Sequence, residues 1–317
     1  MHPSVRHFME RLIDYAGLFP PAQLTVDAAI RHYKRYGEDQ DSWMLGHFVV
    51  SASRLPELVP YMALFSEARP LKLSVVGNRS RSSEECLERL AKDMERIRTF
   101  RKQFRQAAVI DALELPLPPI PIPPVLLEAI GAESSRAGLR LCCETTHTRD
   151  SRWESGTLEA MDAIASVNSG SGTAVGVKIR TGGVTAEAFP APHQVAFVLQ
   201  ACRDRKLPLK FTAGLHHPIR MYRHEASVKM HGFLNVFFAG MLAHAHGLDA
   251  GGIADIVGDE NPDHFVFTDE GLRWRNLTMT AADIQSYRKT AFLAFGCCSF
   301  DEPREELRVL RLLEPRS

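Results

Sequence analysis

The sequence contains no CxxC motif, although it has six cysteines. Four of them form two adjacent pairs, Cys142-Cys143 and Cys297-Cys298, a spacing typical of neither a zinc cluster nor a disulfide framework. We therefore expect reduced thiols and a cytoplasmic protein, because disulfides persist mainly in oxidising compartments.

The sequence also lacks an excess of charge of either sign. Its 38 basic and 38 acidic side chains cancel, and the sequence pI is about 7.2. This balance does not favour nucleic acid or an anionic membrane surface as a partner. We expect a small-molecule partner, and a homo-oligomer stays open.

No apolar run is long enough to cross a bilayer. The longest, at about residues 232–243, is interrupted by Asn235. Glu10 and Asp14 lie within the first apolar stretch and argue against a signal peptide. No membrane role is expected.

The sequence does contain a regular alternation of short apolar strands and helical stretches. Repeated units of this kind favour a parallel sheet that is covered on both faces. For 317 residues, this predicts an α/β fold, a single (β/α)8 TIM-type barrel. The predicted strands lie at residues 45–50, 71–76, 107–113, 139–144, 174–179 and 207–212.

The two ends of the predicted barrel are less regular. We expect residues 1–40 to form an N-terminal helical extension packed on the barrel, and residues 41–317 to form the barrel itself. An insertion is expected at about residues 221–294, before the last strand, with a small hairpin around Asp269-Glu270-Gly271. If the turn-rich segment 14–21 folds over the barrel mouth, Asp14 or Tyr15 enters the site.

Lys178 and Lys210 each lie near the end of an apolar strand and are followed by small residues and glycine. Their spacing is about one βα unit, so neighbouring barrel strands would bring the lysines together. A nucleophilic lysine needs a neutral amine, and a second ammonium in a pocket of low dielectric lowers its pKa. The alternative is that each ammonium is a fixed cation for a phosphate or carboxylate.

Several motifs, taken in order, resemble those of the class I deoxyribose-phosphate aldolases and their barrel relatives. The resemblance covers about residues 107–220 and a short tail, and the shared order is more specific than any single motif. The matching segments are Val109-Ile110-Asp111-Ala112-Leu113, Leu139 to Thr145, Lys178-Ile179-Arg180-Thr181-Gly182, Lys210-Phe211-Thr212-Ala213-Gly214 and Phe295-Gly296-Cys297-Cys298-Ser299.

The resemblance implies a role for each matching residue. Lys178 would form an imine with the substrate, Lys210 would lower the pKa of Lys178, and Asp111 would relay protons. The other residues expected to bind the substrate are Glu144, Arg180, Thr181, Gly182, Gly183, Thr212, Gly214, His216, His217, Cys298 and Ser299. The leading prediction is therefore an aldolase-type lyase that acts on a small carbonyl compound without a cofactor.

Two departures from the family pattern leave the substrate open. His216-His217-Pro218 stands where the family continues with small apolar and basic residues, and Cys297 replaces a small residue of the phosphate-binding turn. We therefore expect a substrate other than deoxyribose 5-phosphate, and its phosphorylation stays open.

Two other classes of function remain. His216, His217 and His231, joined by Glu144 or Glu114, could hold a divalent metal in a metal-dependent hydrolase or isomerase. The third class is a non-catalytic barrel that binds a metabolite.

Overall fold

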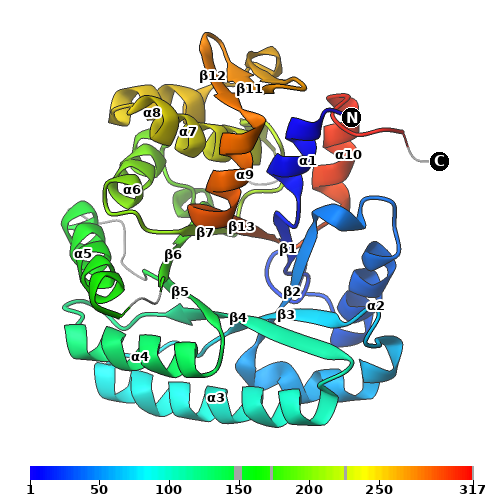
Figure 1. Ribbon diagram of the computed structural model, residues 1–317, viewed down its shortest axis with the longest axis vertical. Helices are drawn as coiled ribbons and strands as arrows, with labels where there is room; N and C mark the ends of the chain where they lie inside the picture. Colours follow the sequence, from blue (N-terminus) through cyan, green and yellow to red (C-terminus); the bar gives the residue numbers. More distant parts are fainter. Residues whose placement is uncertain (146–151, 172–173, 225–226, 316–317) are drawn as a thin grey trace.

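Eight parallel strands close into a barrel in the computed structural model, which describes residues 1–145, 152–171, 174–224 and 227–315 (Figure 1). The order around the barrel is β1-β13-β7-β6-β5-β4-β3-β2. This confirms the predicted (β/α)8 architecture. The strands are β1 (Ile13–Tyr15), β2 (Leu45–Ser51), β3 (Leu71–Val76), β4 (Ala108–Pro116), β5 (Arg140–Glu144), β6 (Gly176–Arg180), β7 (Leu209–Thr212) and β13 (Phe292–Cys297).

Helices connect the strands and surround the barrel (Figure 1). Because each connection between parallel neighbours must return to the same end of the sheet, it crosses the outside as a helix. These helices are α2 (Val26–Gly37), the 3-10 helix η2 (Ala52–Leu64), α3 (Ser83–Phe104), α4 (Pro124–Arg136), α5 (Trp153–Ser171), α6 (Pro192–Asp204) and, after the last strand, α10 (Asp301–Val309).

The connection between β2 and β3 is the 3-10 helix η2 and not an α-helix. Pro56 and Pro60 lie inside η2. Proline has no N–H to donate and its ring crowds the preceding turn, so a regular α-helix cannot run through both positions.

The first forty residues correct one sequence expectation, because they contain a barrel strand. β1 pairs in parallel with β13 through Asp14↔Gly296 and with β2 through Ile13↔Leu45. The chain therefore does not add a purely helical extension to a finished barrel. Its N-terminal part supplies the strand that closes the barrel, between the last strand and the second.

The connection between β7 and β13 is long and carries its own small sheet. It contains α7 (Phe233–His246), α8 (Ala250–Gly258), α9 (Ala281–Thr290), the short helix η4 (Pro262–His264) and the hairpin β8 (Met221–Arg223) with β9 (Val228–Met230). The small antiparallel sheet consists of β10 (Phe265–Phe267), β11 (Gly271–Trp274) and β12 (Leu277–Thr280), with the expected hairpin between β10 and β11.

The longest apolar run of the sequence is the buried helix α7. All its residues from Phe233 to Ala243 are buried, and it packs against α6, α8, β10, β12 and β13. A helix that is apolar all round needs cover on every side, which the inserted elements provide. Among the described residues, no helix combines the length and hydropathy that a bilayer crossing requires.

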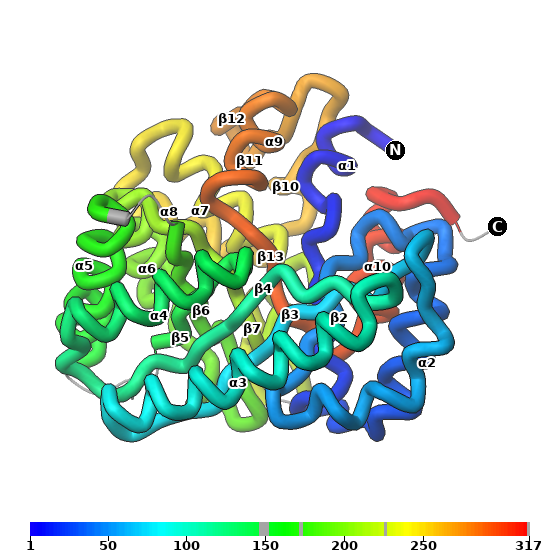
Figure 2. The backbone as a smooth tube through the Cα atoms, turned by 60° about the horizontal axis from the view of Figure 1, so that its bottom comes forward, coloured from blue at the N-terminus to red at the C-terminus, as the bar shows by residue number. Residues whose placement is uncertain are grey.

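The N-terminal helix α1 (Pro3–Met9) lies beside α9 and the small sheet (Figure 2). The hydroxyl of Ser4 donates a hydrogen bond to the backbone oxygen of Thr268, and Phe8 packs against Phe237, Phe238 and Phe267. The insertion and the start of the chain therefore stabilise each other.

Candidate active site

A cavity of about 750 Å³ lies at the carboxyl-terminal ends of the barrel strands. This is the end where active sites of (β/α)8 barrels are built. The segment after β1 contributes Ala16, Phe19, Pro20 and Pro21 to the wall, so residues 16–21 fold over the barrel mouth. Asp14 and Tyr15 lie in β1 and do not line the cavity. The strand ends in the wall are Ser51, Val76, Pro116, Glu144, Arg180 and Thr212.

Lys178 and Lys210 lie side by side, as the sequence predicts. They are register partners on β6 and β7, and each is only 4% exposed. The Nζ of Lys178 is 2.7 Å from Glu114 Oε2, and the Nζ of Lys210 is 2.7 Å from Glu114 Oε1. One buried carboxylate therefore bridges both ammonium groups. Lys178 forms part of the cavity wall, whereas Lys210 pairs with Asp14 on β1.

The acidic neighbours correct the expected effect of Lys210 on Lys178. Burial disfavours the ammonium form of Lys178, but Glu114 and Glu144 outweigh burial and raise its pKa. Burial also disfavours the ammonium form of Lys210, but Asp14 and Glu114 outweigh burial and raise its pKa. The sequence prediction considered the effect of the second ammonium on the pKa of Lys178. It did not consider the effect of the carboxylates between and around the two amines.

Glu114 is the centre of this charged group. Besides the two lysines, it accepts a hydrogen bond of 2.5 Å from the hydroxyl of Ser74. Burial alone would raise its pKa, but the two ammonium groups lower it to about 2. Glu114 therefore remains a carboxylate throughout the physiological pH range.

Asp111 contacts neither lysine, contrary to its expected place beside them. Its neighbour Ala112 is the register partner of Arg140, the first residue of β5, so Asp111 lies toward the amino-terminal end of the barrel. It accepts a hydrogen bond of 2.7 Å from His47 Nε2 and reaches Lys210 only through His47 and Asp14. Glu114, three residues later on β4, is the acid that meets both lysines.

His47 and Asp14 extend the charged group across the barrel. His47 Nδ1 is 3.0 Å from Asp14 Oδ1, and the His47 backbone N–H donates to the same oxygen over 2.6 Å. Burial lowers the pKa of His47, but Asp14 and Asp111 together raise it to about 9. The pKa of Asp14 is lowered by Lys210 and His47 against the effect of burial.

Two arginines lie at the rim of the cavity above Glu144. The Glu144 carboxylate accepts from Lys178 over 2.8 Å through Oε2, while Oε1 lies 3.6 Å from Arg79 and 3.7 Å from Arg180. Among the described residues, Oε1 accepts no hydrogen bond. Arg79 and Arg180 are largely exposed and line the cavity. Their guanidinium groups are therefore available to an anionic ligand.

The glycine turns after β6 and β7 serve close packing as well as the cavity. A Cβ on Gly182 would lie 2.8 Å from the Cα of Gly214 and 2.5 Å from the Phe189 ring. The hydroxyl of Thr181 donates a 2.6 Å hydrogen bond to the Ala213 backbone oxygen, and Thr181 is fully buried. Of these predicted ligand residues, Gly183, Thr212 and Gly214 line the cavity, while Thr181 and Gly182 support the two loops.

The three histidines proposed as metal ligands do not converge. His216 Nδ1 lies 2.8 Å from Glu302, and His217 Nδ1 lies 2.8 Å from Glu306. His231 is fully buried, with Nε2 at 2.6 Å from the Pro190 backbone oxygen and Nδ1 at 3.1 Å from Arg220. His216 and His217 line the cavity, and His231 does not.

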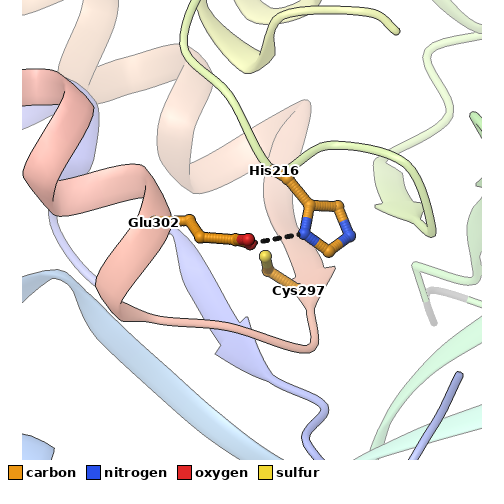
Figure 3. A group of neighbouring side chains, drawn as sticks. All are labelled: His216, Cys297 and Glu302. Carbon is orange, nitrogen blue, oxygen red and sulfur yellow. Dashed lines mark hydrogen bonds and ion pairs between the residues drawn. The ribbon is translucent and has the colours of Figure 1, made fainter. Parts of the chain in front are cut away.

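A different group of potential ligands forms around His216. One ring nitrogen of His216, the sulfur of Cys297 and a carboxylate oxygen of Glu302 all lie within 4.8 Å of one another (Figure 3). Cys298 and Ser299, which the sequence predicts to bind the substrate, line the cavity beside them. The Cys298 sulfur is 3.9 Å from His216 Nε2, and the hydroxyl of Ser299 accepts a hydrogen bond from the Glu302 backbone N–H.

Comparison with known proteins supplies no family for the chain. No family model and no curated protein matches it. Similar solved structures include human mitochondrial enolase superfamily member 1, at 9% identity, with 95% of this chain and 58% of that chain covered and a TM-score of 0.40. Another is the carboxyl transferase domain of Rhizobium etli pyruvate carboxylase with pyruvate, at 12% identity, 81% and 47% coverage and a TM-score of 0.42.

The assignment of the barrel fold therefore rests on the strand topology and not on these comparisons. The chain spans only about half to three fifths of the length of these two structures. At such identities and TM-scores, neither comparison carries an argument about activity. The resemblance to deoxyribose-phosphate aldolases gains no support from them.

Sequence reasoning missed His47, Ser74 and Arg79. A signal was present for His47, which is a polar residue inside the apolar part of a strand that is buried up to its last residue. Ser74 gives a weaker signal, because its strand also contains Lys72. Arg79 follows β3 in a polar segment that also contains Arg81, so nothing in the sequence distinguishes it from a surface arginine.

Proposed function

We propose that this chain is an enzyme, a lyase of the aldolase type that forms an imine between Lys178 and a small anionic carbonyl compound. The observation that carries the proposal is the position of Lys178. Its amine lies in the cavity wall between the carboxylates of Glu114 and Glu144, at 2.7 and 2.8 Å.

The raised pKa of Lys178 is compatible with imine chemistry for an electrostatic reason. The ammonium and a carbonyl combine to give a protonated imine and water, so the product carries the same positive charge at the same nitrogen. Carboxylates that stabilise the resting ammonium also stabilise this iminium. The raised pKa makes the addition step less favourable, because the Lys178 nitrogen must first release a proton to a neighbouring carboxylate.

We assign Glu144 as the proton acceptor of the two carboxylates, because its Oε1 accepts no hydrogen bond among the described residues. Glu114 binds both lysines, whose ammonium groups lower its pKa to about 2, and it also accepts a hydrogen bond from Ser74. Glu144 contacts only one lysine at short distance. In the cleavage direction, Glu144 would take the hydroxyl proton as the carbon-carbon bond breaks, and the electron pair of that bond would pass into the enamine. Return of a proton to the enamine carbon completes the step.

The rim of the cavity supports an anionic substrate. Arg79 follows β3, Arg180 ends β6, and both approach Glu144 Oε1. A carboxylate or phosphate between them would bind through charge-assisted hydrogen bonds and hold its carbonyl carbon toward Lys178.

The test is reductive trapping on the purified full chain. The protein is incubated with borohydride and, one at a time, pyruvate, glyoxylate, dihydroxyacetone phosphate and acetaldehyde, and the adduct is located by peptide mass analysis. We expect an adduct on Lys178 with at least one anionic carbonyl compound. The Lys178→Ala variant should show none, and Lys92→Ala, which removes an exposed lysine of α3, should trap as the wild type does.

If no compound gives an adduct on Lys178 and the Lys178→Ala variant keeps any activity that is found, the imine mechanism is wrong. A chain that binds anionic carbonyl compounds without trapping or turnover would be a metabolite-binding barrel, the non-catalytic class that the sequence leaves open.

A further inference from the structure

Three side chains from separate elements meet at one wall of the cavity. His216 follows β7, Cys297 ends β13 and Glu302 lies in the first turn of α10. Figure 3 shows the three side chains pointing toward one another, with the His216 ring nitrogen facing Glu302 and the Cys297 sulfur beside them. His216 is distant in sequence from Cys297 and Glu302, and the three meet because β7 and β13 are neighbours in the barrel.

The donor set suits a borderline divalent metal ion. A thiolate, an imidazole nitrogen and a carboxylate oxygen are the three ligand types that zinc takes in proteins. Tetrahedral ligand atoms around zinc lie about 3.5 Å apart, given bonds of about 2.0–2.3 Å. The three atoms here already lie within 4.8 Å of one another, so small side-chain rotations would bring them to that geometry.

The surroundings favour a metal ligand over a thiol nucleophile at Cys297. Cys297 is 1% exposed, so a substrate cannot reach its sulfur from the cavity. His216 and Glu302 do line the cavity, and an ion held by all three residues would be open on that side. Three protein ligands and one open position is the arrangement of catalytic zinc sites, whereas structural sites are closed by four.

We propose that His216, Cys297 and Glu302 bind one zinc ion whose open coordination position faces the cavity. This site goes beyond the imine chemistry proposed for Lys178 and differs from the set His216, His217 and His231 that the sequence suggests. It keeps His216 and replaces the other two histidines by Cys297 and Glu302. Within the same cavity, the ion would bind an oxygen atom of a ligand that also reaches Lys178.

Metal content tests the proposal directly. The full chain, without a histidine tag, is stripped with a chelator, incubated with zinc sulfate, dialysed and analysed for bound metal. We expect about one zinc ion per chain. Loading with Co²⁺ instead should give a sulfur-to-cobalt charge-transfer band, which reports a thiolate ligand independently of any activity.

Matched variants decide which residues bind the ion. Cys297→Ser should abolish the cobalt charge-transfer band, and Glu302→Gln should weaken zinc binding by at least tenfold. Cys298→Ser and His217→Gln change the residues next to Cys297 and His216 and should retain one zinc ion per chain. Circular dichroism of each variant shows whether it is folded.

The results also separate this proposal from the imine proposal. Lys178→Ala should keep its zinc, so loss of trapping at Lys178 and loss of metal are independent outcomes. The metal proposal is overturned if the folded wild type retains less than about a tenth of one zinc ion per chain after loading. It is equally overturned if Cys297→Ser binds zinc and shows the cobalt band as the wild type does.

Discussion

At the scale of single residues, ionisable side chains alternate in sign along one hydrogen-bonded row through the barrel. The row runs from Asp111 through His47 and Asp14 to Lys210, and continues through Glu114 and Lys178 to Glu144. A buried charge is tolerated when it is paired and hydrogen-bonded, so each member depends on its neighbours. A proton moved at one end changes the electrostatic environment of the next member.

The first prediction concerns the pH dependence of stability through His47. Its folded-state pKa of about 9 lies above the value of about 6.5 expected in the unfolded chain, so the charged imidazole stabilises the fold fully below pH 6.5. That stabilisation is lost as the pH rises from 6.5 to about 9. The expected loss is up to about 3 kcal/mol, reduced by solvent screening at the partly exposed Asp111.

The measurement is the free energy of unfolding in urea between pH 6 and pH 9.5 for the wild type and His47→Gln. The advantage of the wild type should shrink as the pH rises. His244→Gln is the control, because burial lowers the pKa of His244 and its effect belongs below pH 6.5. Parallel curves for the wild type and His47→Gln across this range would contradict the prediction.

At the scale of elements, the long connection between β7 and β13 has two structural roles. The connection must carry the chain back to the amino-terminal end of the barrel, and the helix that does so, α7, is apolar on every face. The inserted α8 and the β10–β12 sheet provide its cover. The insertion is therefore part of the core and not an appendage to a finished barrel.

The second prediction tests how closely α7 packs on the barrel. A Cβ at Gly240 would lie 2.3 Å from a ring carbon of Phe292, which is 1% exposed. Gly240→Ala should therefore destabilise the fold by about 1–3 kcal/mol, because the ring and the helix must move apart. In Gly170→Ala, in α5, the new Cβ meets no atom of the described residues within 4 Å, and the variant should be as stable as the wild type or more stable by up to about 1 kcal/mol.

Chemical unfolding of both variants measures the difference. A Gly240→Ala protein as stable as the wild type would mean that α7 packs more loosely than the structure indicates. A destabilised Gly170→Ala protein would show that glycine is required in these helices for a reason other than space.

At the scale of the whole molecule, the barrel is closed by the two ends of the chain. β1 and β13 are neighbours, and Ala16 N–H donates a 2.7 Å hydrogen bond to the Cys297 backbone oxygen. The start of the chain also supplies Asp14, the partner of Lys210. Closure and the candidate site therefore depend on the same short strand.

The third prediction is that a chain beginning at Ala22 does not form the native barrel. Removal of β1 leaves the edges of β13 and β2 unpaired and Lys210 without Asp14. We expect loss of the cooperative thermal transition and a larger hydrodynamic volume, measured by circular dichroism and size-exclusion chromatography.

The matched control shortens the chain at a position outside the barrel. Met221 and Met230 are register partners of the β8–β9 hairpin, so residues 222–229 can be replaced by Asn-Gly. This variant should unfold cooperatively. A cooperative transition in the chain that begins at Ala22 would show that β1 is dispensable.

The sequence by itself determined the strands β2 to β7 and the meeting of Lys178 with Lys210. These features follow from local patterns, since an apolar run defines each strand and consecutive parallel strands are neighbours. Only the tertiary structure decided that Ile13–Tyr15 is a barrel strand, because three residues are too few to show a period. It also decided the charge state of the lysines, because Asp14 and Glu114 are distant in sequence and a pKa depends on what surrounds a group in space. The group of His216, Cys297 and Glu302 was beyond sequence patterns for the same reason, since its members meet only where the last strand and its helix reach the mouth of the closed barrel.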